Sequence, residues 1–294
     1  MKTIEKIAAR AADLGNGMVI RRALPSRQRR MVGAWCFLDH AGPVEFPPGK
    51  GMNVGAHPHT ALQTFTWLIE GEVLHRDSLG NVQVIRPGQV NLMTAGRGIV
   101  HTEESLPEER RLHAAQLWIA LPSSVADCEP AFDHYPELPR WLAGDCAFTL
   151  LAGTFGGKTA PARLHSPLVG LDVASGQGGV VDLALDPAFE YGILPLEGSV
   201  RIGATDFATD EFAYLGAGAD ALKVELAAGT RILLLGGEPF GEQIVMWWNF
   251  VGYGKEAIAK AQHDWESGDP RFGEVAGHEG KRLAAPALPW ANPA

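Results

Sequence analysis

The chain contains little cysteine, with three residues of this type in a sequence of 294. Cys36, Cys128 and Cys146 lie far apart, a pattern typical neither of a disulfide framework nor of a cysteine-ligated metal site. We therefore expect free thiols in a reducing compartment and predict that the protein is cytoplasmic.

Positive charge is also scarce. The 25 lysines and arginines are outnumbered by 34 aspartates and glutamates, which gives a net charge of −9. Phosphate backbones and anionic membrane surfaces repel such a chain, so we expect no direct nucleic-acid or membrane partner. No apolar run approaches the roughly 18 residues needed to span a bilayer, and residues 1–6 lack the apolar core of a signal peptide.

Several common catalytic motifs are missing. The sequence contains no nucleophile elbow, P-loop or complete dinucleotide-binding fingerprint. The segment Gly96-Arg97-Gly98 lacks the third glycine and the helix that a phosphate site requires. Hydrolysis by a serine nucleophile, nucleotide-phosphate chemistry and dinucleotide-dependent redox reactions are therefore disfavoured.

Glycine and proline, by contrast, are abundant, with 35 and 20 residues spread along the chain. Such spreading indicates many turns and hence many short strands. Between residues 60 and 120, β-branched and aromatic runs alternate with turn residues, and no helical run intervenes. We predict an all-β fold built from antiparallel sandwiches or barrels.

The second half of the chain repeats this pattern. Residues 128–140 contain three prolines and are interpreted as a linker, after which strand-like runs continue to residue 235. Residues 67–73 resemble 194–200, and residues 93–96 faintly resemble 215–218 in the same order, which favours a duplicated barrel.

A short helix is predicted near the C-terminus. Residues 255–266 place Ile258, Ala261 and Trp265 near helical spacing, and Gly268 follows as a stop signal.

The sharpest chemical feature is a set of histidines. Residues two apart on a strand point to the same face, so His57 with His59, and His101 with Glu103, would each present two donor groups together. Three imidazoles and one carboxylate suit Fe(II), with Mn, Cu, Ni or Zn also possible. An isolated His-x-His is more often structural, and the later His-x-Glu strengthens the metal hypothesis.

Other titratable groups receive simpler interpretations. His75, His113 and His134 are expected to be ordinary structural or surface histidines. Glu104 is adjacent to Glu103 and would point the opposite way on a strand, so we interpret it as a solvated charge.

These residues carry a family resemblance. Gly51 followed by His57-Pro58-His59 resembles the first cupin motif, and residues 68–71 and 93–103 resemble the pirin branch of the cupins. The resemblance implies a bicupin of two barrels: residues 1–135 with a metal, and residues 136–294 without a ligand set.

The resemblance also implies the ligands His57, His59, His101 and Glu103. In the second half, the repeat aligns these with positions that cannot form the same set: Ala184, Asp186, Lys223 and Glu225. One departure is Gln63, which stands where the general cupin motif has glutamate, and which we expect to alter hydrogen bonding around the ligands.

By the same resemblance, the function is that of an Fe(II)-dependent dioxygenase that cleaves quercetin or a related flavonol with O2 and releases carbon monoxide. Glu103 would accept the proton of the substrate hydroxyl. Candidates for the apolar walls are Phe37, Phe65, Trp67 and Trp118, although aromatic residues buried in a barrel more often belong to the plain core. The alternatives are a redox-sensitive iron-binding regulator that acts through a protein partner and, more weakly, a metal-assisted hydrolase or isomerase.

Overall fold

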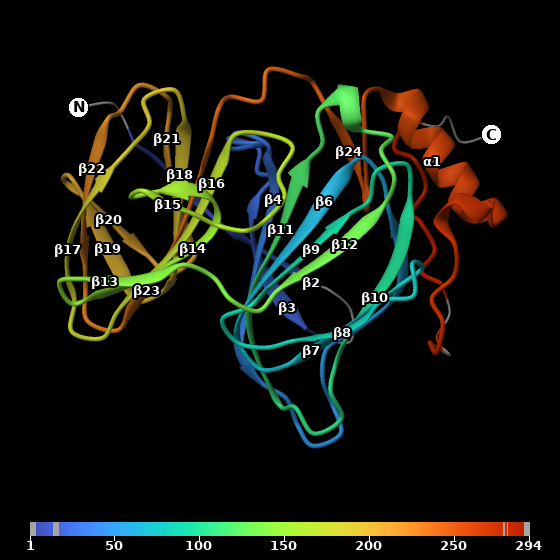
Figure 1. Ribbon diagram of the computed structural model, residues 1–294, viewed down its shortest axis with the longest axis horizontal. Coiled ribbons are helices and arrows are strands. Elements are labelled where there is room, and N and C mark those ends of the chain that lie inside the picture. The colour runs from blue at the N-terminus through green and yellow to red at the C-terminus, as the bar shows by residue number, and fades with distance from the viewer. Residues whose placement is uncertain (1–3, 14–17, 279, 281, 291–294) are drawn as a thin grey trace.

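The computed structural model describes residues 4–13, 18–278, 280 and 282–290, and Figure 1 shows two lobes side by side. Each lobe consists of a large and a small antiparallel sheet, an arrangement compatible with a cupin jelly roll. The all-β fold with a short C-terminal helix is confirmed, although the sheets do not close into continuous barrels. Among the described residues, no helix is long and apolar enough to cross a membrane.

The first lobe carries the histidine motif. Its elements are β2 (Arg10–Asp13), β3 (Val19–Leu24), β4 (Trp35–Glu45), β5 (Asn53–His59), β6 (Leu62–Glu70), β7 (Val73–Asp77), β8 (Val82–Ile85), β9 (Val90–Thr94), β10 (Ile99–Ser105), β11 (Arg111–Ala120), the 3-10 turn η1 (Ser123–Val125) and β12 (Ala131–Tyr135). The large sheet has the order β12-β9-β6-β11-β4-β3-β2, and the small sheet has the order β5-β10-β7-β8. The two sheets enclose the space in which the candidate site lies.

The second lobe is filled with apolar side chains. Its strands are β1 (Glu5–Ala8), β13 (Arg140–Ala143), β14 (Cys146–Phe155), β15 (Lys158–Thr159), β16 (Leu168–Ser175), β17 (Gly179–Ala184), β18 (Glu190–Glu197), β19 (Ser199–Ile202), β20 (Thr205–Ala208), β21 (Glu211–Leu215), β22 (Ala221–Leu226) and β23 (Thr230–Gly237). The large sheet has the order β1-β21-β18-β23-β16-β14-β13, and the small sheet has the order β17-β22-β19-β20. The positions that the repeat aligns with the histidine motif are exposed: Ala184, Asp186, Lys223 and Glu225.

A shared hydrophobic core joins the two lobes. Phe65 and Trp67 of β6 are buried in one cluster with Leu194 and Leu233 of the second lobe. The indole nitrogen of Trp35, which is fully buried, donates to the carbonyl of Gly236 across this core at 3.2 Å. The large sheets of the two lobes are therefore held together by packing as well as by the connecting chain.

The two ends of the chain cross over between the lobes. Near the N-terminus, β1 pairs with β21 in the second lobe. At the other end, β24 (Val245–Trp247), β25 (Phe250–Gly252), α1 (Lys255–Ser267) and the 3-10 turn η2 (Pro270–Phe272) follow the second lobe in sequence. The helix α1 lies beside the first lobe (Figure 1). There Phe250 and Trp265 are buried in one cluster with Val100. A domain boundary at residue 135 remains a prediction.

Two local expectations have different outcomes. The helix α1 ends as predicted at Gly268, which adopts the left-handed conformation (φ 75°) that favours glycine. The interpretation of residues 128–140 as a linker is wrong in part, because β12 pairs with β9 along five residues and extends the large sheet. Prolines flank this strand rather than interrupt it, so backbone pairing across the sheet remains available.

Candidate metal centre

A cavity of about 340 Å³ lies between the two sheets of the first lobe. His57 and His59 reach it from β5, and His101 and Glu103 reach it from β10. The two strands are antiparallel neighbours in which His101 is directly paired with His57. The structure therefore places all four sequence-predicted residues on the wall of one cavity.

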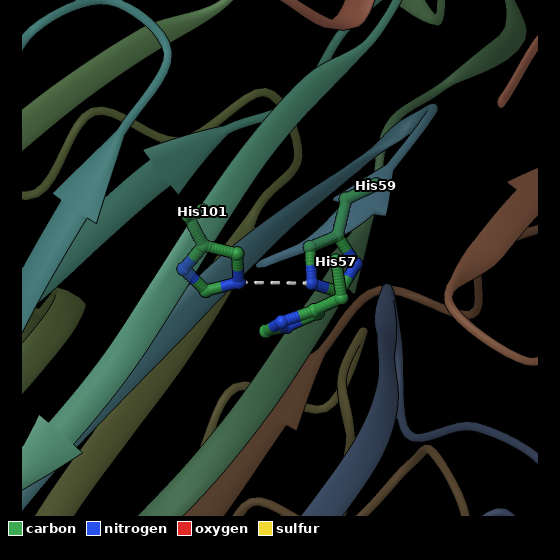
Figure 2. A group of neighbouring side chains, drawn as sticks. All are labelled: His57, His59 and His101. Carbon is green, nitrogen blue, oxygen red and sulfur yellow. Dashed lines mark hydrogen bonds between the residues drawn. The ribbon is translucent and has the colours of Figure 1, made fainter. Parts of the chain in front are cut away.

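The three imidazole rings converge on one another, as Figure 2 shows. The ring centroids of His57 and His101 are 4.2 Å apart, and those of His57 and His59 are 5.0 Å apart. The Nε2 atoms of His59 and His101 are separated by 3.1 Å. Each of the three rings offers a nitrogen within 4.8 Å of the others, which is the arrangement needed to hold one ion.

Backbone carbonyls fix the orientation of two rings. His57 Nδ1 donates to the carbonyl of Gly55 at 2.8 Å, and His59 Nδ1 donates to the carbonyl of Asn249 at 3.0 Å. A carbonyl can only accept, so a neutral ring held in this way carries its lone pair on Nε2. Asn249 lies next to β25, 190 residues from His59 in the sequence, and its contribution was not predicted.

A third ring is oriented by another histidine. His75 Nε2 donates to the carboxylate of Asp77 at 3.0 Å, and His75 Nδ1 is 3.3 Å from Nδ1 of His101. In the neutral state, His101 therefore donates to His75 and points its own Nε2 lone pair into the cavity. The expectation that His75 is an ordinary histidine is incomplete, since its ring also lies close to Glu103.

Burial keeps these rings neutral. It lowers the pKa of His57 to about 4 and lowers the pKa of His59 and of His101 well below the ordinary value. The positive charges that the neighbouring histidines would carry act in the same direction. The neutral imidazole is the form that binds metals, so the cluster is in its ligating state at neutral pH.

The donor set fits a metal ion in two respects. The lone pairs of His59 and His101 face each other at 3.1 Å, and two nitrogens bound at right angles to one metal at about 2.1 Å would lie about 3 Å apart. Burial raises the pKa of Glu103, whose nearest hydrogen-bonding side chain is the hydroxyl of Thr66 at 3.5 Å. Among the described residues, no lysine or arginine forms an ion pair with Glu103, so a cation in the cavity would supply the missing charge.

The aromatic walls are only partly those expected. Phe37 and Trp118 are stacked with centroids 4.0 Å apart and line the cavity. Phe65 and Trp67 do not line it and belong to the hydrophobic core instead, which was the alternative interpretation of these residues. Side chains alternate along β6, and these two therefore face the core between the lobes.

Gln63 lies on that same outward face of β6. Its side-chain amide donates to Thr94 Oγ1 at 2.9 Å and to the carbonyl of Arg163 at 3.1 Å. The expected effect of Gln63 on hydrogen bonding around the ligands is therefore not seen, because its partners lie outside the cavity lining.

Glu104, His113 and His134 lie outside the cavity lining. The two histidines are structural, as expected, whereas Glu104, interpreted as a solvated charge, is half-buried. Glu104 faces away from Glu103 and forms an ion pair with Arg76. His113 is buried against His40, with Nε2 atoms 2.9 Å apart, and His134 is bonded to Asn91.

Comparison with known proteins agrees with this geometry. The family model described as "Pirin" matches residues 17–119, and the model described as "Pirin C-terminal cupin domain" matches residues 170–273. A Pseudomonas aeruginosa protein named "Putative quercetin 2,3-dioxygenase" is 62% identical over 98% of this chain and 91% of its own length. The chain belongs to the pirin family. A pirin-like protein of Caulobacter vibrioides is 38% identical over 88% of this chain and 92% of its own length.

A solved structure agrees with this assignment. The crystal structure of a quercetin 2,3-dioxygenase from Acinetobacter baumannii matches this pirin with a TM-score of 0.95 and 49% identity, covering 97% of this chain and 96% of that one. The prediction of a pirin-type bicupin is thus confirmed.

Proposed function

We propose that this pirin is an Fe(II)-dependent dioxygenase that cleaves quercetin or a related flavonol with O2 and releases carbon monoxide. The observation that carries the proposal is the convergence of His57, His59 and His101 in a cavity whose lining also includes Glu103 and a stacked aromatic pair. The names of the relatives from Pseudomonas aeruginosa and Acinetobacter baumannii support the choice of substrate.

The ligand set would be the three histidines and Glu103, which together offer nitrogen and oxygen donors. Fe(II) held there would supply a Lewis acid that lowers the pKa of a nearby enol and a redox-active centre for the reaction with O2. Mn, Cu, Ni and Zn also suit such donors, so the metal has to be identified by reconstitution.

The protein groups have three further roles. Glu103 would accept the proton of the flavonol 3-hydroxyl, since its carboxylate lies on the cavity wall beside the histidines. The Phe37–Trp118 stack would orient the flat ring system of the substrate. The apolar walls formed by residues such as Val54 and Leu112 would exclude bulk water from the reacting carbons.

The test is carbon monoxide release and O2 uptake from quercetin by protein reconstituted with Fe(II), with Mn(II), Ni(II), Cu(II) and Zn(II) in parallel. His101→Ala should lose both the metal, measured by elemental analysis, and the carbon monoxide release. His165→Ala is the matched control, because this histidine is exposed in the second lobe, and it should behave as the wild type.

Two results would contradict the proposal. Release at the wild-type rate by His101→Ala would show that the reaction occurs elsewhere. Absence of release from wild-type protein that holds one metal per chain would reject the dioxygenase and favour a metal-dependent regulator with a protein partner.

A further inference from the structure

The cavity wall formed by the large sheet carries two parallel rows of side chains. Side chains at alternate positions of β6, β11, β4 and β3 point into the cavity, and the strand register aligns them across the sheet. One row is mainly aromatic, and the other is polar. The aromatic row is Thr64, Trp118 and Phe37, and the polar row is Thr66, Gln116, Asp39 and Arg22.

The polar row starts beside the candidate metal centre. The hydroxyl of Thr66 lies 3.5 Å from Glu103 and donates to Oε1 of Gln116 at 2.9 Å. Asp39 lies in the same row as Thr66, two strands further across the sheet. At the usual spacing of strands, the backbones at these two positions are about 10 Å apart. The row therefore runs across the sheet from the neighbourhood of Glu103 to a second polar point on the same cavity wall.

That second point is an ion pair. Arg22 donates through Nε to Asp39 Oδ1 at 2.7 Å and through Nη2 to Oδ2 at 2.6 Å. Asp39 is almost fully buried, with 2% of its surface exposed. Buried ion pairs contribute little stability relative to apolar side chains of similar volume, so fold stability alone does not account for a pair at this position.

The pair is also fixed against the aromatic row. The guanidinium of Arg22 lies 4.4 Å from the ring centroid of Phe37, and Phe37 is in turn stacked on Trp118. This arrangement keeps the carboxylate of Asp39 rigid. Each carboxylate oxygen uses one lone-pair site for Arg22 and keeps another for a further donor.

The charge of the cavity wall selects the kind of group that binds at this second point. Among the described residues that line the cavity, Asp13, Asp39 and Glu103 carry carboxylates, whereas Arg22 is the one lysine or arginine and is already paired. A ligand carboxylate or phosphate would be repelled there. A neutral hydroxyl that donates a hydrogen bond would be accepted.

We propose that Asp39, held by Arg22 and assisted by Gln116, is a specificity-determining subsite that recognises a phenolic hydroxyl at the end of a planar aromatic substrate remote from the metal. The inference rests on the proposed function because it assigns the same cavity to the substrate. It narrows the substrate class to flavonols hydroxylated at that end.

The test compares two ligands that share the 3-hydroxy-4-oxo group. Quercetin carries additional phenolic hydroxyls, and 3-hydroxyflavone carries none. Both are titrated anaerobically into the Fe(II)-loaded protein, and binding is followed by tryptophan fluorescence. Asp39→Asn should weaken quercetin binding about tenfold, because a hydrogen bond to a charged acceptor is lost, and should leave 3-hydroxyflavone unchanged.

Two further variants keep the test specific. Gln116→Leu should weaken quercetin binding in the same selective way, about threefold. Asp172→Asn is the matched control, because this buried carboxylate is paired with Arg231 and lies outside the cavity lining. It should leave the ratio of the two affinities unchanged even if the protein becomes less stable.

The outcomes separate the two proposals. If the wild type binds both flavonols but Asp39→Asn weakens them equally or not at all, the subsite is refuted and the dioxygenase proposal stands. If the metal-loaded wild type binds neither flavonol, both proposals are refuted. A selective loss for quercetin, with metal content unchanged, supports the subsite.

Discussion

Replacement of Trp35 by phenylalanine tests whether the core between the lobes holds them together. Trp35 is fully buried, meets Phe65 edge-on at 5.5 Å and donates to the carbonyl of Gly236 at 3.2 Å. Phenylalanine cannot donate, so the buried carbonyl loses this partner at a cost of about 1–2 kcal/mol. The smaller ring removes about a further 1 kcal/mol of packing. We expect Trp35→Phe to lower the free energy of unfolding by about 2–3 kcal/mol.

The assay is urea unfolding followed by far-UV circular dichroism, which reports on strands in both lobes. The corresponding fall in Tm is roughly 4 °C for a chain of this length. Trp141→Phe is the control, because Trp141 is partly exposed on β13 and stacks on Phe148 alone among aromatic residues of the described structure. It should cost less than about 1 kcal/mol. A loss below about 0.5 kcal/mol for Trp35→Phe, or one no larger than the control, would refute the reasoning.

Two predictions concern other buried groups. Burial beside His40 lowers the pKa of His113 to about 4. As the pH falls, His113 is therefore protonated in the unfolded chain at a higher pH than in the folded protein. Stability is lost between about pH 6.5 and 4, and His113→Gln should reduce this loss by about 1–2 kcal/mol in urea titrations at several pH values; an unchanged slope would contradict it. Burial raises the pKa of Cys36 to about 12 and Cys146 is also buried, so a thiol reagent should modify Cys128 alone until denaturant is added. Rapid labelling of more than one thiol in the native protein would be inconsistent with this.

Much of the candidate site could be predicted because it depends on local rules. The alternation of side chains along a strand is enough to place His57 with His59, and His101 with Glu103. Between residues 60 and 120, the alternation of strand-forming runs with turn residues is regular enough to indicate an all-β fold. Gly268 likewise ends the helix for a reason that depends only on its own backbone.

The remainder depends on contacts between distant residues. The alternation rule shows that Phe65 and Trp67 share a face, but not whether that face borders the cavity or the core between the lobes. Nothing in the local sequence links the Asn249 carbonyl to His59. The role of His75 could have been predicted from the sequence, because Asp77 lies two residues later and on the same face of β7. A histidine and an aspartate in this arrangement can form a buried hydrogen bond that orients the imidazole ring.

The crossing of the chain ends has a consequence for biosynthesis. His59 is oriented by the carbonyl of Asn249, and α1 packs against Ala56 and Val100 of the first lobe. When the ribosome has synthesised both histidine motifs, Asn249 and α1 have therefore not yet been synthesised. The orientation of His59 is therefore complete only when nearly the whole chain has been synthesised.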